Sequence, residues 1–315
     1  MRAPLRVGVI GVGHLGQHHA RLYAARRDVT LVGVADAKPG RADEIAARHG
    51  SKGHTDPWAL LREVDAVSVA VPTSAHFEVA AEYLRAGVHA LVEKPITATL
   101  AEAHELIAIA AAGARTLHVG HTERFNPALA AARALVRRPR FLECQRLGTF
   151  APRSLDVDVV LDLMIHDLDV VLSLVPSEVV AIDAVGVNAL TEKIDIANAR
   201  LRFADGAAAN LTASRISMGK TRKLRVFQPE SYLSIDYASR QVQYFSLQRS
   251  AAGAPEISGR EIGVEEGEPL AIEIDAFLRA VQGGDDQGVS GADGLRALSA
   301  ARGVVDAIEA GRAVA

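Results

Sequence analysis

The stretch that decides the fold is Leu5-Arg6-Val7-Gly8-Val9-Ile10-Gly11-Val12-Gly13-His14-Leu15-Gly16. An apolar run of strand character enters the pattern GxGxxG, and the residues up to about Arg26 predict a helix. Gly11 permits a tight turn, Gly13 lets a pyrophosphate approach the backbone, and Gly16 lets helix and strand pack closely. The helix N-terminus offers free N–H groups and a positive dipole end to the phosphates. The loop residues that we expect to bind a dinucleotide are Gly11, Gly13, His14, Leu15 and Gly16.

The end of the next predicted strand indicates which dinucleotide is bound. Residues 29–35 read as a strand that ends at Asp36, twenty residues past Gly16. A carboxylate there can accept hydrogen bonds from both hydroxyls of the adenosine ribose and would repel a 2′-phosphate, which predicts NAD rather than NADP. Lys38 and Arg41 follow closely and could soften that preference. The alternative is an aspartate that caps a helix after a strand.

Strands and helices alternate up to residue 120, which predicts a parallel, doubly wound sheet. The carboxyl ends of parallel strands meet at one edge, where such sheets bind ligands. Two further turns fall at that edge, Val71-Pro72-Thr73-Ser74 and Glu93-Lys94-Pro95, so Lys94 is expected beside the dinucleotide. An exposed ion pair of Glu93 and Lys94 is the alternative. The predicted strands are 66–71, 88–92 and 116–120, and the predicted helices are 42–49, 75–86 and 99–112, the last opening with a capping box.

Composition limits the class of protein. A chain of 315 residues suits two domains, and 49% hydrophobic with 23% charged residues indicates a globular protein. The net charge of -3 gives no general attraction to nucleic acid or acidic membranes. The first apolar run is broken by Gly8 and Gly11 and predicts a strand rather than a signal peptide, and no run suits a membrane span. Cys144 is the one cysteine, which fits a reducing cytoplasm, so we expect a cytoplasmic protein.

After Gly120 the pattern changes from alternating strands and helices to successive strands. Consecutive strands without helices between them predict a mostly antiparallel sheet. The segment 250–259 is rich in Gly, Ala, Pro and Ser and predicts a mobile loop. The expected elements are a helix from Pro127 to about Arg137, strands at 140–148, 179–187, 196–203, 207–216, 224–227, 232–237 and 241–247, and helices at 269–281 and 291–310.

One predicted helix, residues 158–174, carries a stripe of Asp and His. Asp158, Asp162, His166 and Asp169 stand at i, i+4, i+8 and i+11, along one helix face. The stripe has three interpretations. It is a solvent-exposed acidic face, a metal site, or a catalytic histidine whose imidazole is oriented by carboxylates. No further His or Cys pair joins the stripe obviously, so we predict no metal.

Several motifs together resemble the GFO/IDH/MocA family of sugar and cyclitol dehydrogenases. They are Pro72-Thr73 with His76, the run from Ala86 to Pro95, and Asp162-x-x-x-His166. The resemblance implies a Rossmann domain, residues 1–121, and an α/β domain with a large, mostly antiparallel sheet, residues 122–315. It implies a cis peptide before Pro95. The residues it adds to the site are Pro72, Thr73, His76 and Glu93 for the cofactor, Lys94 on the reacting hydroxyl, His166 as acid/base and Asp162 as its support.

The run Gly120 to Pro127 is similar to the branch of that family that oxidises UDP-N-acetylglucosamine at its 3-hydroxyl to feed amination for lipid A. A nucleotide-sugar substrate needs cations and hydrogen-bonding groups, for which the sequence offers Arg124, Asn126 and Arg153 beside Lys94, Asp162 and His166. Further basic residues form a cluster: Arg215, Lys220, Arg222, Lys223 and Arg225. This cluster has two interpretations, a binding site for the diphosphate and a solvated or subunit-interface patch. We expect a homodimer or homotetramer built through the second domain's sheet. Two other functions stay open: a dehydrogenase of a free sugar or inositol, and a non-catalytic dinucleotide-binding regulator.

Overall fold

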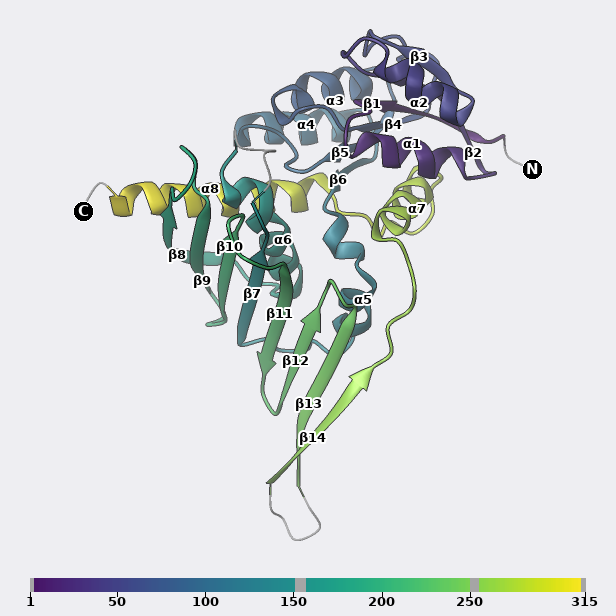
Figure 1. The fold of residues 1–315 in the computed structure, drawn as a ribbon. Coiled ribbons are helices and arrows are strands. Elements are labelled where there is room, and N and C mark those ends of the chain that lie inside the picture. The colour runs from purple at the N-terminus through teal and green to yellow at the C-terminus, as the bar shows by residue number, and fades with distance from the viewer. Residues whose placement is uncertain (1–2, 151–156, 250–254, 313–315) are drawn as a thin grey trace. The chain divides into compact units, whose positions relative to one another are not determined.

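The computed structural model describes residues 3–150, 157–249 and 255–312, drawn as a ribbon in Figure 1. Contacts between Cα atoms group the chain into two compact units, residues 1–122 with 270–295, and residues 123–269 with 296–315. Residues 270–295 thus group with the first unit and not with the rest of the expected second domain. The reason is apolar packing, because Ile274, Phe277 and Leu278 share a core with Val7 and Val9.

The first unit holds a parallel six-stranded sheet in the order β3-β2-β1-β4-β5-β6. Its central strands are apolar on both faces because helices cover both, as a doubly wound sheet requires. Val7, Val9, Val67 and Val92 are fully buried. The strands are β1 Leu5–Ile10, β2 Val29–Ala35, β3 Lys52–His54, β4 Ala66–Val69, β5 His89–Glu93 and β6 Leu117–Gly120. The helices are α1 Gly16–Ala24, α2 Arg41–His49, α3 His76–Arg85, α4 Leu100–Ala112 and α7 Pro269–Val281.

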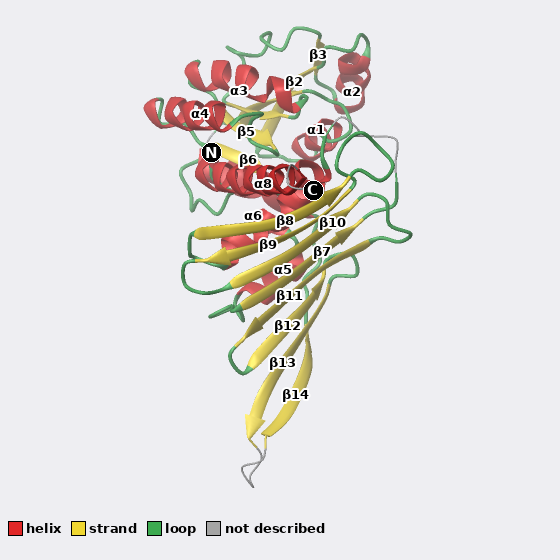
Figure 2. Ribbon diagram, turned by 90° about the vertical axis from the view of Figure 1, so that its left-hand side faces the viewer, coloured by secondary structure: helices red, strands yellow, loops and turns green. Residues whose placement is uncertain are grey.

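The second unit holds an eight-stranded sheet in the order β14-β13-β12-β11-β7-β10-β9-β8. The pair β7 and β10 is parallel, and the other neighbouring pairs of described strands are antiparallel, so the expected mostly antiparallel sheet is confirmed. The strands are β7 Phe141–Leu147, β8 Val179–Val187, β9 Ile196–Phe203, β10 Ala208–Ser214, β11 Thr221–Gln228, β12 Ser231–Asp236, β13 Gln241–Arg249 and β14 Pro255–Ile262. Helices α5 Pro127–Arg133 and α6 Ile165–Leu174, with the later part of α8 Gly291–Arg312, lie on one face (Figure 2). Three short helical turns complete the elements of the described residues: Thr73–Ala75, Thr122–Phe125 and Val160–Met164.

One local prediction was wrong, and another was confirmed only in part. The expected loop at 250–259 is a strand from Pro255 onward, because β14 pairs along its whole length with β13, from Pro255 opposite Arg249 to Ile262 opposite Val242. Its Pro, Ser and Gly content hid this pairing. The helix expected from Asp158 begins with a π-helical turn, Val160–Met164, before α6. A π-turn widens the helix, so the stripe does not follow one regular α-helical face.

The capping box that opens α4 is confirmed. The hydroxyl of Thr99 accepts a hydrogen bond from the backbone N–H of Glu102 at 3.2 Å, and the Glu102 carboxylate accepts one from the Thr99 N–H at 2.9 Å. None of the helices in the described ranges is both long and apolar enough to cross a membrane.

Candidate active site

The glycine loop after β1 has the shape that a dinucleotide needs. Gly11 has a φ of +83°, which favours glycine, and a Cβ there would lie 2.6 Å from the carbonyl oxygen of Ala70. A Cβ at Gly16 would lie 1.8 Å from the carbonyl oxygen of Gly11, so α1 packs against the turn only with glycine there. A Cβ at Gly13 would meet no protein atom within 4 Å. Space is therefore open above Gly13, where the motif expects the pyrophosphate.

Asp36 lies next to this loop. Its Oδ2 accepts a hydrogen bond from the backbone N–H of Val12 at 2.9 Å, and its Oδ1 accepts one from the N–H of Lys38 at 2.9 Å. The Arg41 guanidinium donates to the carbonyl oxygen of Val12 at 2.9 Å and pairs with Glu44 at 2.7 Å. The loop and Asp36 thus form one hydrogen-bond network, and Arg41 belongs to that network.

Two turns at the carboxyl edge of the sheet are joined by His76. Its Nδ1 lies 2.8 Å from the carbonyl oxygen of Pro95, and its Nε2 lies 3.0 Å from that of Val71. The peptide between Lys94 and Pro95 is cis, as the family resemblance implied. Burial lowers the pKa of His76, although both carbonyls oppose that shift. A neutral imidazole has one N–H and can donate to only one of these carbonyls at a time.

Beneath Lys94 lies a buried polar network that the sequence did not reveal. His19 Nε2 is 3.1 Å from Glu93 Oε1, and His19 Nδ1 is 3.0 Å from the Ser68 hydroxyl. The Tyr23 hydroxyl lies 2.8 Å from that of Ser68. Glu93 Oε2 accepts a hydrogen bond from the Lys94 N–H at 3.3 Å. Burial would raise the pKa of Glu93, but the hydrogen bond from His19 and the nearby charge of Lys94 outweigh it and hold that pKa below its ordinary value.

In the second unit the stripe of Asp and His divides into two kinds of residue. Asp158 accepts a hydrogen bond from the backbone N–H of Ile194 at 3.0 Å. Asp169 is buried and forms a two-pronged ion pair with Arg124, at 2.9 and 2.7 Å. Asp162, in the π-helical turn, and His166, in the first turn of α6, are half-buried. The stripe is therefore not a solvated face. No group of three or more His, Cys, Asp or Glu in the described ranges is placed to hold a metal ion.

The neighbour of His166, Asp167, anchors α6 to the sheet. Arg146 of β7 donates to both oxygens of Asp167, at 2.9 and 2.8 Å, and pairs with Glu123 at 2.8 Å. The Arg146 and Asp167 side chains are only 6% and 4% exposed. Burial opposes the charge on Glu123, yet Arg146 holds the pKa of Glu123 below its ordinary value. This cluster leaves no signal in the sequence, because an isolated Arg in a strand does not indicate its partner.

Residues expected to bind the substrate have structural contacts in the second unit. Arg124 holds Asp169, and Asn126 caps α5 by accepting from the Ala128 N–H at 3.1 Å while donating to Glu123 at 2.9 Å. Arg153 lies outside the described residues. Whether these residues also contact a substrate stays a prediction.

The basic cluster separates into buried and exposed members. Arg215 is buried and donates to Asp195 at 2.9 Å, to the Val157 carbonyl oxygen at 2.8 Å and to the Thr191 hydroxyl at 3.1 Å. Arg225 pairs with Glu143 on the neighbouring strand. Lys220, Arg222 and Lys223 are exposed, with Lys223 at 3.6 Å from Asp236. Arg215 is thus built into the fold.

The fold and the glycine loop define a dinucleotide-dependent oxidoreductase of two units. Residues 5–121 match the model of the oxidoreductase family with an NAD-binding Rossmann fold, and residues 128–231 match the GFO/IDH/MocA C-terminal domain. The chain belongs to the GFO/IDH/MocA family, as its motifs predicted.

Particular relatives narrow this class. The chain is 42% identical, over 97% of its length and 98% of the relative, to UDP-N-acetylglucosamine 3-dehydrogenase of Acidithiobacillus ferrooxidans. A solved structure of that enzyme matches with a TM-score of 0.93 and 41% identity, over 98% of this chain and 99% of that one. Inositol 2-dehydrogenase of Rhizobium meliloti is 26% identical, over 96% of this chain and 97% of the relative. Scyllo-inositol dehydrogenase of Lactobacillus casei with bound NAD(H) and scyllo-inositol, at 20% identity and a TM-score of 0.82, shares the fold over 98% of both chains.

Proposed function

We propose that this enzyme uses NAD to oxidise the 3-hydroxyl of UDP-N-acetylglucosamine to the 3-keto sugar. The observation that carries the proposal is the 42% identity, over nearly the whole of both chains, to a UDP-N-acetylglucosamine 3-dehydrogenase. The inositol 2-dehydrogenases among the curated relatives are less similar, at 26–32% identity, and two of them match over little more than half of this chain. The 3-keto product would then be consumed by amination for lipid A, and the proposed compartment is the cytoplasm.

Alcohol oxidation removes a hydride from carbon and a proton from oxygen. The nicotinamide, when bound, accepts the hydride. His166 takes the proton as general base, and Asp162, one turn earlier, orients its imidazole. The Lys94 ammonium donates to the reacting oxygen and stabilises the developing alkoxide. Both His166 and Lys94 are half-buried, which leaves each accessible to a small substrate.

The proposed cofactor contacts follow the glycine loop and the edge of the parallel sheet. Asp36 accepts from the adenosine ribose hydroxyls, which selects NAD over NADP. Its oxygens are already held in place by the N–H groups of Val12 and Lys38. Gly11, Gly13, His14, Leu15 and Gly16 bind the pyrophosphate, and Pro72, Thr73, His76, Glu93 and Lys94 form the nicotinamide side of the site.

The proposed substrate contacts are Lys94, Arg124, Asn126, Arg153, Asp162 and His166. Two nitrogens of the Arg124 guanidinium bind Asp169, so Arg124 would contact the substrate while it stays paired with that carboxylate. Lys220, Arg222 and Lys223 are the exposed cations that remain for a diphosphate.

We also propose that the enzyme assembles as a homodimer or homotetramer through the second unit's sheet. Figure 2 shows α5, α6 and α8 on one face of this sheet. The opposite face carries a row of stacked rings on four neighbouring strands. Its members are Phe141, Phe227, Tyr232 and Phe245, with successive ring centroids 5.7, 5.4 and 4.6 Å apart. Arg225 and Glu143 lie on the same face. A face that combines a row of rings with both signs of charge suits a second copy of itself.

The proposal is tested by NADH formation with UDP-N-acetylglucosamine, free N-acetylglucosamine and myo-inositol side by side. An aminotransferase and glutamate are added to draw off the ketone. We expect turnover with the nucleotide sugar and its loss in Lys94→Ala and His166→Asn, with unchanged NAD affinity in His166→Asn. Activity only on free N-acetylglucosamine or myo-inositol, which carry no nucleotide, would make the enzyme a dehydrogenase of free sugars or inositol. Tight NAD binding without turnover of any substrate would favour a regulatory protein.

A further inference from the structure

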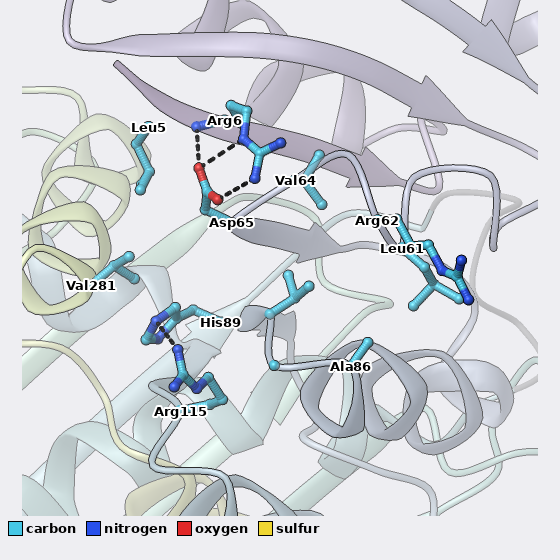
Figure 3. A pocket seen from close by; sticks show the side chains of 12 residues that line it. Leu5, Arg6, Leu61, Arg62, Val64, Asp65, Ala86, His89, Arg115 and Val281 are labelled. Atoms are coloured by element: carbon cyan, nitrogen blue, oxygen red, sulfur yellow. Dashed lines mark hydrogen bonds and ion pairs between the residues drawn. The ribbon is translucent and has the colours of Figure 1, made fainter. Parts of the chain in front are cut away.

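The first unit has a cavity at the edge of its parallel sheet opposite to the glycine loop (Figure 3). It has a volume of about 590 Å³ and lies where β1 and β5 begin, at Leu5 and His89. Lys94 follows the other end of β5. A strand extends roughly 3.3 Å per residue, so the five residues of β5 separate Lys94 from the cavity. The cavity is therefore separate from the dinucleotide site, and its volume is within the range of about 300–1,000 Å³ of small-molecule sites.

The tautomer of His89 is fixed by the backbone. The N–H of Thr116 donates to His89 Nδ1 at 2.9 Å, so Nδ1 must keep its lone pair. A neutral imidazole with an accepting Nδ1 carries its proton on Nε2. Burial and the charge of Arg115 lower the pKa of His89, against a weaker opposing effect of Asp65, and the neutral ring is thereby favoured. His89 therefore presents a donor, Nε2–H, on its other side.

The group next to that donor is a second donor. Arg115 Nη1 lies 3.3 Å from His89 Nε2, and Figure 3 shows the two side chains directed toward one another. Neither can accept a hydrogen bond from the other, because a guanidinium has no acceptor and Nε2 carries a proton. Arg115 is held in this place by a hydrogen bond from its Nε to the Gly113 carbonyl oxygen, at 2.9 Å. An acceptor placed between these two fixed donors would satisfy the hydrogen-bonding capacity of both.

The charge of the cavity lining indicates what that acceptor is. Three arginines line it, Arg6, Arg62 and Arg115, against Asp65 as the one carboxylate among the lining residues. Asp65 is already engaged, since Arg6 donates to it through its backbone N–H, Nε and Nη2 at 3.0, 3.2 and 2.6 Å. Arg62 makes no hydrogen bond or ion pair with the part of the chain that the structure describes. The lining therefore has an excess of positive charge and of donors.

We propose that this cavity binds a small oxyanion, a phosphate or a carboxylate, whose oxygen accepts from both His89 Nε2–H and Arg115. Charge-assisted hydrogen bonds of this kind are stronger than neutral ones, and a guanidinium suits the planar or tetrahedral oxygen pairs of these groups. The rest of the lining is largely apolar, with Leu5, Val64, Val88 and Val281, so an organic part of the ligand has a surface to contact.

The test is isothermal titration calorimetry of the full-length enzyme with saturating NAD, which occupies the pyrophosphate site. The probes are inorganic phosphate, glycerol 3-phosphate and propionate, at an ionic strength held constant with sodium chloride. We expect saturable binding of at least one probe. Preference for glycerol 3-phosphate or propionate over inorganic phosphate would identify an organic anion as the ligand.

Two variants separate this cavity from other anion sites. In His89→Asn the side-chain oxygen replaces Nδ1 and still accepts from Thr116, whereas the donor at Nε2 is lost. Arg115→Gln removes the guanidinium charge. Each substitution is expected to raise the dissociation constant of the bound anion at least about ten-fold. The control Arg48→Gln removes a charge from the exposed pair with Glu44 on α2 and should leave the affinity unchanged.

Either of two results would overturn the proposal. No saturable binding of any probe to the wild-type enzyme would mean that the cavity holds water only. Wild-type affinity in the His89→Asn variant, with its NAD affinity intact, would place the anion elsewhere.

Discussion

His19 Nε2 lies 3.1 Å from Glu93 Oε1, with both side chains buried in the first unit. One arrangement of protons uses every donor in this network. Tyr23 donates to Ser68, Ser68 donates to His19 Nδ1, and His19 Nε2–H donates to Glu93. The other Glu93 oxygen accepts from the Lys94 N–H. Helix α1, which follows the glycine loop, is thereby connected to the backbone of the proposed catalytic lysine.

Loss of the His19 donor is expected to destabilise the protein and to change its response to acid. His19→Leu leaves the Glu93 carboxylate buried without that partner, at a cost of about 3 kcal/mol in the free energy of unfolding. In His19→Gln the amide nitrogen takes the place of Nε2, and most of that loss should be recovered.

The pH dependence follows from the lowered pKa of Glu93. A carboxyl group whose pKa is lowered on folding stabilises the protein above its ordinary pKa, and this contribution is lost as the pH falls through the folded value. Urea unfolding across the acid range should show this loss in the wild-type protein and a flatter profile in His19→Leu. Equal pH profiles of the two proteins would contradict it.

Two glycines of the same loop should respond oppositely to alanine. At Gly13 a methyl group meets no protein atom, so Gly13→Ala should unfold near the wild-type temperature but lose most of its NAD affinity. At Gly16 a methyl group would lie 1.8 Å from the Gly11 carbonyl oxygen, so Gly16→Ala should lower the melting temperature itself. Thermal unfolding with and without NAD measures both effects. A Gly13→Ala protein stabilised by NAD as strongly as the wild type would contradict the proposed pyrophosphate position.

Asp36 is expected to decide between the two dinucleotides. Asp36→Ser removes the acceptor for the ribose hydroxyls and the repulsion of a 2′-phosphate. The ratio of kcat/KM for NAD to that for NADP should fall by roughly 10- to 100-fold, since a hydrogen bond to a charged group contributes about 1.5–3 kcal/mol. An unchanged ratio would show that Asp36 accepts only from the N–H groups of Val12 and Lys38 and does not contact the ribose.

Local signals in the sequence predicted much of the first unit. The glycine loop, the capping box at Thr99 and the turn at Pro95 each depend on a few adjacent residues, and the structure has all three. The successive strands of the second unit up to β13 were predicted for the same reason. Strand β14 was missed because its pairing with β13, and not its own composition, makes it a strand.

The buried polar contacts could not be predicted, because their partners are far apart in the chain. His19 and Glu93 are 74 residues apart, and Arg146 and Asp167 are 21 apart. A sequence shows that a charged residue is present but not which opposite charge compensates its burial. The stripe of Asp and His illustrates the consequence. Asp169 looked similar to Asp162, yet Arg124, 45 residues earlier, makes Asp169 structural.

Arg215 and Arg225 provide a matched test of the basic cluster. Arg215 connects Asp195 to the Val157 carbonyl oxygen, just before the π-helical turn that carries Asp162. Arg215→Gln should therefore reduce the free energy of unfolding by about 3–5 kcal/mol, as breaking a buried ion pair does. Arg225→Gln removes a pair with Glu143 that is exposed in a single copy of the chain, so below the concentration at which the protein assembles it should change the free energy of unfolding by less than about 1 kcal/mol. Urea unfolding of both variants measures the difference, and equal stabilities would mean that Arg215 is not the structural residue its contacts indicate.

The row of aromatic rings should control assembly. Phe245 stacks on Tyr232 at 4.6 Å, and opposite it stands Gly259, where a Cβ would lie 2.8 Å from the ring. The glycine lets the ring lie over β14, which leaves a flat apolar surface on that face of the hairpin. Phe245→Glu places a charge in the proposed interface and should convert the oligomer to monomers in sedimentation velocity experiments. The control is Arg260→Glu, because Arg260 lies over Tyr244 on the opposite face of the hairpin and should leave the assembly intact. A wild-type protein that sediments as a monomer, or an oligomer that Phe245→Glu leaves unchanged, would exclude this face as the interface.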